Sequence, residues 1–135
     1  MKRIFLILLA FIPLLSAHSQ NGYYSRFEND TLAIGNDLIE RKFVWNKGNL
    51  ITYSLINKAS GQQLFNRIKT PDFQISKDID KVSNTSYTSR EVKETSIHPA
   101  HLEAEIRFSL GTLHIKKIYR IYKDSPTIAC DIYLK

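Results

Sequence analysis

A segment rich in histidine and glutamate carries the densest group of side chains that could do chemistry. His98 and His101 lie three residues apart, and Glu103 and Glu105 follow at two-residue spacing. On an extended chain alternate residues share a face, so His101, Glu103 and Glu105 would lie side by side. A histidine beside a carboxylate can relay a proton or bind a divalent ion. The alternative, which we favour, is an exposed loop that enters a strand with a charged outer face.

The same two glutamates can be considered as the carboxylate pair of a glycosidase. Such a pair must approach the glycosidic bond from two sides, whereas Glu103 and Glu105 would lie about 7 Å apart on one strand and point the same way. We expect them instead to pair with Lys116, Lys117 or Arg120 of the next strand. The sequence has no phosphate-binding loop, Ser/His/Asp order or nucleophile elbow. We therefore assign no catalytic residue, no metal and no cofactor.

Arg41 and Trp45 lie in one file of alternating residues with Ile39 and Phe43. A buried guanidinium needs a carboxylate or a ligand as its partner, and for Arg41 we favour a structural pairing. Trp45 suits packing in a core, and its ring is equally suited to stacking on a sugar. The candidate substrate-binding residues are Arg41, Trp45, His98 and His101.

Size and composition allow one compact domain. The chain has 135 residues, of which 43% are hydrophobic and 24% charged, as in ordinary globular proteins. Nineteen basic residues face 13 acidic ones, and the net charge falls from +6 to +4 without Lys2 and Arg3, which lie in the expected signal peptide. That excess is too small to indicate nucleic acid binding. Cys130 is the only cysteine, which excludes an intrachain disulfide and a cysteine-rich metal site.

Residues 1–19 have the order of a secretory signal peptide. Lys2 and Arg3 precede an apolar run over residues 4–15, and Ala17 and Ser19 occupy the −3 and −1 positions of a small-residue cleavage site. The run is too short to span a bilayer, and no cysteine follows it to carry a lipid. We predict an exported protein, periplasmic or extracellular, without a membrane anchor in the mature chain. Residues 20–30, polar and aromatic without a steady period, are expected to form a flexible lead-in.

Residues 31–135 predict an all-β domain. Two-residue alternation broken by turn residues continues to the end of the chain, and no segment favours an amphipathic helix. The fold class is therefore an antiparallel β-sandwich. The polar residues 77–100 are expected to form long exposed edge strands or a hairpin. The other expected strands cover residues 31–34, 38–45, 50–56, 62–65, 102–110, 113–123 and 127–134.

The last strands give the clearest alternation. In residues 102–110 the apolar residues point one way, toward a core, and the charged residues point the other way, toward water. In the final strand Ile128, Cys130, Ile132 and Leu134 alternate inward, which would place Cys130 in the core. The sequence stops at Lys135 within this strand, so we expect the sandwich to be incomplete at its C-terminus.

Two stretches resemble a known family. Residues 36–61, with NDLIERKF, WNKGNLIT and SLINKASG, and residues 119–134, YRIYKDSPTIACDIYL, resemble the N-terminal domain of exported bacterial alpha-galactosidase-like glycoside hydrolases, the melibiase group. The resemblance implies a β-supersandwich, similar in shape to galactose mutarotase, that precedes a (β/α)8 barrel with two catalytic aspartates. No position of this sequence matches those aspartates.

The resemblance implies a function for residues 31–135. They would form the non-catalytic N-terminal domain of a secreted alpha-galactosidase-like glycoside hydrolase acting on alpha-linked galactosides, with carbohydrate and a C-terminal (β/α)8 catalytic domain as partners. The alternative is a stand-alone carbohydrate-binding or adhesion module that uses an exposed Trp45 and tyrosines. A third hypothesis, a small epimerase-like enzyme, would use His98, His101 and Glu103.

Overall fold

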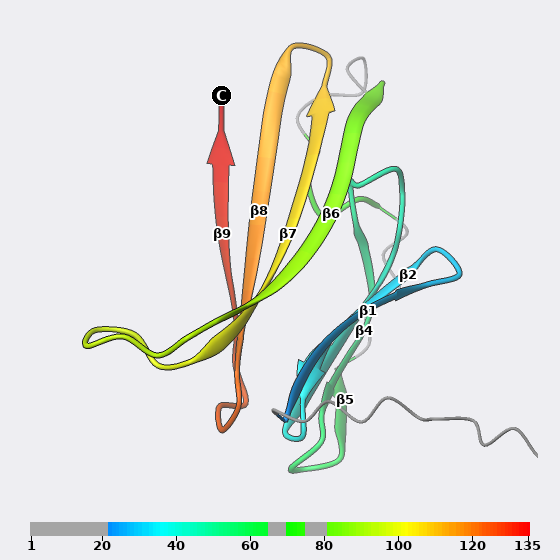
Figure 1. Ribbon diagram of the computed structural model, residues 1–135. Coiled ribbons are helices and arrows are strands. Elements are labelled where there is room, and N and C mark those ends of the chain that lie inside the picture. The colour runs from blue at the N-terminus through cyan, green and yellow to red at the C-terminus, as the bar shows by residue number, and fades with distance from the viewer. Residues whose placement is uncertain (1–21, 65–69, 75–80) are drawn as a thin grey trace, which may run out of the picture.

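The computed structural model describes residues 22–64, 70–74 and 81–135. In these ranges the chain forms nine β-strands and no helix, which confirms the all-β fold class. The strands make two antiparallel sheets that pack as a β-sandwich (Figure 1). None of the described residues belongs to a helix that could cross a membrane. The predicted signal peptide, residues 1–19, lies outside the described residues.

Each sheet is a meander in which neighbouring strands follow one another along the chain. The five-stranded sheet contains β1 (Tyr23–Glu28), β2 (Thr31–Asn36), β3 (Ile39–Val44), β4 (Ile51–Asn57) and β5 (Gln62–Leu64). The four-stranded sheet contains β6 (Val82–Val92), β7 (His101–Leu110), β8 (Leu113–Tyr122) and β9 (Ile128–Leu134). As predicted for the polar third of the domain, β6 is a long and mostly exposed edge strand.

The expectation of a flexible lead-in over residues 20–30 is wrong for its larger part, because β1 forms there and pairs with β2 over six residues. Its alternate side chains face the other sheet. The hydroxyl groups of Ser25 and Tyr87 lie 2.6 Å apart, and the rings of Phe27 and Tyr87 lie 5.7 Å apart. The strand depends on partners distant in the chain, which its own weak alternation does not reveal.

The core lies between the inner faces of the two sheets. The ring of Phe43 on β3 lies 5.2 Å from the ring of Tyr119 on β8, and both side chains are buried. The sheets approach each other most closely where β1 and β2 face β7 and β8. The fully buried apolar residues of this region include Leu32, Ile34, Ile106, Ile115 and Ile121.

The two faces of β7 differ less than the alternation predicts. Leu102, Ala104, Ile106, Phe108 and Leu110 are all buried, as expected. On the opposite face Arg107 is exposed, but Glu103 and Ser109 are buried as well. The expectation of a water-facing outer side is therefore wrong at these two residues, because polar neighbours on adjacent strands and loops cover them.

The inward placement of Cys130 is also wrong, because this cysteine is exposed. Its strand, β9, is the edge of the four-stranded sheet, and the end of this strand lies away from the five-stranded sheet (Figure 1). The alternation itself is as predicted, since Cys130 pairs with Tyr119 and Ile132 with Lys117. At the end of β9, however, the inner face is not covered by the described residues of the opposite sheet, so Ile132 and Leu134 remain 49% and 56% exposed.

The turn between β3 and β4 fixes the distance between the sheets. Asn46 accepts a 2.9 Å hydrogen bond from the backbone of Asn49, and Gly48 between them has a φ of 93°. A Cβ atom at Gly48 would lie 3.2 Å from side-chain atoms of both Phe108 and Thr85. Glycine at this position therefore allows both the positive φ and the close approach of the other sheet.

Substitution of Gly48 by alanine is expected to lower the free energy of unfolding by about 2 kcal/mol or more, through backbone strain and contact with Phe108. Gly61→Ala is the matched control, because Gly61 also has a positive φ, 68°, but nothing lies within 4 Å of its added Cβ. Urea unfolding of both variants measures the difference. Equal losses would show that packing at Gly48 contributes nothing.

Candidate functional site

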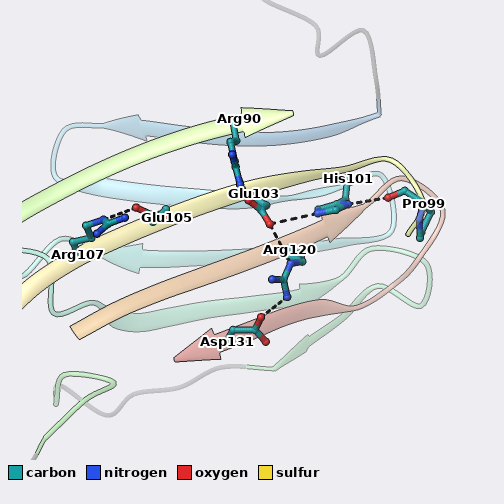
Figure 2. A network of polar contacts seen from close by, with 8 residues as sticks. All are labelled: Arg90, Pro99, His101, Glu103, Glu105, Arg107, Arg120 and Asp131. Atoms are coloured by element: carbon teal, nitrogen blue, oxygen red, sulfur yellow. Dashed lines mark hydrogen bonds and ion pairs between the residues drawn. The ribbon is translucent and has the colours of Figure 1, made fainter. Parts of the chain in front are cut away.

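Charged residues of all four strands meet on the outer face of the β6–β9 sheet (Figure 2). Glu103 on β7 accepts hydrogen bonds from Arg90 on β6 at 2.7 and 2.9 Å and from Arg120 on β8 at 3.2 Å. Arg120 also donates to Asp131 on β9. The predicted pairing of Glu103 with Arg120 is thus confirmed, whereas Glu105 pairs with Arg107 on its own strand.

The surroundings of Glu103 keep its carboxylate charged. Burial by itself would raise the pKa of Glu103, but the hydrogen bonds from Arg90 and Arg120, the charge of Arg90 and the contact with His101 together outweigh it. The pKa of this carboxyl group therefore lies below its ordinary value. A carboxylate whose pKa is lowered and which pairs with two guanidinium groups is suited to holding strands together and is a poor general acid.

His101 lies beside Glu103, as the two-residue spacing predicts. Its Nε2 atom is 3.6 Å from a Glu103 carboxylate oxygen, and its Nδ1 atom is 2.8 Å from the carbonyl oxygen of Pro99 (Figure 2). The ring also packs 5.2 Å from the ring of Tyr122. Only 4% of His101 is exposed, so a substrate has no direct access to the imidazole.

His98 lies apart from this network, in the exposed loop that precedes β7. Its backbone N–H donates to the hydroxyl of Thr95 at 3.1 Å, and its carbonyl accepts from the backbone of Thr95 at 2.8 Å. These contacts stabilise a tight turn. A surface hollow of about 540 Å³ lies between this loop and the β8–β9 turn, lined by Pro99 and Tyr122 among others, but neither histidine lines it.

Arg41 occupies a different place, at the interior of the sandwich. Its guanidinium donates to the hydroxyl of Thr52 at 2.6 Å and to the carboxylate of Asp72 at 3.2 Å. It also lies over the rings of Phe43 and Tyr119, at 4.7 and 5.8 Å from their centroids. The favoured structural pairing of Arg41 with a carboxylate is therefore confirmed.

Asp72 connects this interior cluster to the other sheet. It accepts hydrogen bonds from the backbone and the hydroxyl of Thr52 at 3.1 and 2.9 Å, and its carboxylate lies 3.7 Å from Nζ of Lys117 on β8. Lys117 is only 3% exposed. Burial lowers its pKa, and the charge of Asp72 offsets part of that shift. The carboxylate thus neutralises two cations, one from each sheet.

Trp45 follows the end of β3 and is half-buried. The edge of its ring contacts Phe27 on β1, with 4.9 Å between the ring centroids, and the side chain packs against the core. Of the four predicted site residues, Arg41 and Trp45 thus belong to the inner side of the five-stranded sheet, His101 to the outer face of the other sheet, and His98 to a loop. The fold does not bring them into one site.

The charged side chains described above mainly form ion pairs and hydrogen bonds with one another. Among the described residues no group of three or more His, Cys, Asp or Glu side chains could hold a metal ion. No family model, curated protein or solved structure matches the chain. The arrangement of the side chains is therefore the basis for any functional conclusion, together with the resemblance of the two sequence stretches.

Sequence reasoning missed Asp72, and it was wrong to expect Lys117 to pair with Glu103 or Glu105, because Lys117 lies beside Asp72 on the inner face. Asp72 and Lys117 meet across the sandwich although they are 45 positions apart, and nothing in the local pattern marks them as partners. Lys117 was detectable only as a lysine in phase with Ile115 and Tyr119. Arg90 could have been found by pairing β6 with β7, since it lies opposite Glu103 in the register.

Glu103→Gln is expected to reduce the free energy of unfolding by about 2 kcal/mol at neutral pH, because it removes charge-assisted hydrogen bonds. The lowered pKa of Glu103 means that this contribution is present above the ordinary value of 4.5 and is lost as the pH falls through the folded-state value. The variant should therefore show a flatter loss of stability below pH 4.5 in urea unfolding.

The control for this experiment is Glu105→Gln. Glu105 pairs with Arg107, whose side chain is 57% exposed, so the expected loss is below about 1 kcal/mol. If Glu105→Gln were as costly as Glu103→Gln, the buried network would have no special role in stability.

Asp72→Ala is expected to cost about 3 kcal/mol, because it leaves Arg41 and the buried Lys117 without a compensating charge. Lys117→Met alone should be neutral or stabilising, because it replaces a buried charged side chain with an uncharged side chain of similar length. In the Lys117→Met background the cost of Asp72→Ala should fall by about 1 kcal/mol or more. Chemical unfolding of the four proteins measures the coupling, and strict additivity would contradict the proposed interaction across the sandwich.

Proposed function

We propose that this chain is a non-catalytic β-sandwich domain of an exported alpha-galactosidase-like glycoside hydrolase that acts on alpha-linked galactosides. A sequence resemblance and the observed fold support this proposal. The sequence stretches over residues 36–61 and 119–134 resemble this group, and the two-sheet antiparallel fold is of the kind that the resemblance implies.

The exposed apolar residues at the end of β9 are the main structural support for the proposal. Ile128, Cys130, Ile132 and Leu134 share the face of the sheet that β7 and β8 bury in the core. Ile128 packs against the core, whereas Ile132 and Leu134 on the same face are about half exposed. Apolar side chains in such a row favour contact with a further domain, for which we propose the (β/α)8 catalytic domain of the parent enzyme.

The carboxylates of the described residues are consistent with a supporting role. Glu103 is occupied by Arg90 and Arg120, and Glu105 by Arg107. A glycosidase needs one carboxylate that can donate a proton and a second that approaches the bond from the other side. The pair on β7 is not arranged in this way, so hydrolysis is assigned to the partner domain.

The alternative, a stand-alone carbohydrate-binding or adhesion module, would use an exposed Trp45 and tyrosines. The ring of Trp45 is half-buried, and its contacts with Phe27 and the core favour packing over stacking on a sugar. Export from the cell remains part of the proposal and depends on residues 1–19.

The coding sequence downstream of the Lys135 codon gives a direct test. We expect an open reading frame that continues for several hundred residues with alternating strand and helix patterns. A stop codon directly after Lys135 in the native gene would contradict the proposal.

In the parent enzyme, Ile132→Asp is expected to destabilise the protein by about 2 kcal/mol or more, because it places a charge in an apolar interface. In the chain of 135 residues the same substitution should have little effect. Val44→Asp is the control, since Val44 is a comparably exposed apolar residue, at 42%, on the other sheet. Equal effects of the two substitutions in the parent enzyme would exclude β9 as the domain contact.

A further inference from the structure

The β6–β9 sheet has a hollow near the β7–β8 hairpin. Its volume is about 480 Å³, within the range of small-molecule binding sites. The start of β6, the hairpin and the end of β9 lie together at this end of the sheet (Figure 1). The polar residues of its lining are Asn84, Arg107, Ser109, His114, Lys116, Tyr133 and Lys135, and Phe108, Ile115 and Leu134 line it as well.

The hollow is lined by two cationic side chains whose charges are not fully compensated by the described residues. Arg107 and Lys116 are directly opposite each other on β7 and β8, an arrangement of like charges that destabilises a sheet. Arg107 uses its Nε atom for Glu105, and its terminal nitrogens make no hydrogen bond to the described residues. Lys116 forms no ion pair within the described part of the chain. No aspartate or glutamate side chain lines the hollow.

The other half of the same face shows the contrast. Around Glu103 the two arginines, Arg90 and Arg120, are matched by two carboxylates, those of Glu103 and Asp131 (Figure 2). Near the hairpin, Arg107 pairs with Glu105, whereas Lys116 forms no ion pair with the described residues. The positive charge is therefore concentrated at the hollow, where an anion would relieve the repulsion between the two cations.

The remaining groups of the hollow are suited to a sugar ring. Tyr133 is 47% exposed and lies opposite Lys116, whose Nζ atom is 4.2 Å from the centroid of the tyrosine ring. Ser109 is buried, and its hydroxyl lies 2.8 Å from Nδ1 of His114 and 3.4 Å from the amide nitrogen of Asn84. This contact orients the His114 ring and leaves its Nε2 atom for another partner.

We propose that this hollow binds a saccharide unit that carries an anionic group, a carboxylate or a sulfate. Arg107 and Lys116 hold the oxyanion, Tyr133 contacts the apolar face of the ring, and Asn84 and His114 bond to hydroxyl groups. The site does not depend on the function proposed above.

The test is an NMR titration of the full chain with galacturonate, galactose and inorganic sulfate. We expect galacturonate to bind more tightly than both other probes, to shift the signals of His114 and Tyr133, and to weaken as salt is added. Sulfate binding as tight as that of galacturonate would show an anion site without a sugar subsite. Equal binding of galactose, or no binding of galacturonate, would overturn the role of the cations.

Lys116→Gln and Arg107→Gln should each weaken galacturonate binding about tenfold or more, the loss expected for a charge-assisted hydrogen bond. Lys93→Gln makes the same change of charge as Lys116→Gln at an exposed residue outside the hollow, and should leave the affinity unchanged. Thermal unfolding separates binding from folding, because Lys116→Gln should preserve or raise the melting temperature by removing like-charge repulsion. An equal loss of affinity in Lys93→Gln, or unchanged affinity in Lys116→Gln, would contradict the site.

Discussion

The side chain of Asn36 joins the two sheets at one end of the sandwich, and the rest of the arrangement depends on this connection. It is fully buried and makes four hydrogen bonds. Its amide nitrogen donates to the carbonyl oxygens of Tyr122 and Ser125 at 2.6 and 2.7 Å, and its amide oxygen accepts from the backbones of Leu38 and Ile39 at 2.8 Å. Since every polar group of the amide is satisfied, the β2–β3 turn is held against the β8–β9 turn without the cost of a buried unpaired group.

A second connection across the sandwich is ionic. Asp72 lies between Arg41 of the five-stranded sheet and Lys117 of the four-stranded sheet, and the hydroxyl of Thr52 completes the cluster. This explains why the polar residue Thr52 of β4 is buried. Charges inside a small sandwich need a complete set of partners, and here the partners come from both sheets.

The alternation of β9 gives its two faces separate properties. Ile132 and Leu134 extend the apolar inner face beyond the reach of the other sheet, and Tyr133 between them extends the basic outer face at the hollow. Successive side chains of a strand point to opposite faces, and at the end of β9 both Tyr133 and Leu134 line the hollow.

The sequence by itself determined the strands, because two-residue alternation and turn residues act over a few positions: the β3–β4 hairpin, the β7–β8 hairpin around Gly111 and the apolar face of β7 could all be predicted. Tertiary structure decided what covers each face. It made a strand of Tyr23–Glu28, exposed Cys130, buried Lys117 beside Asp72 and separated Arg41 from His101. Burial and ion pairing depend on which distant strands meet, and a local pattern contains no information on the extent of the opposite sheet.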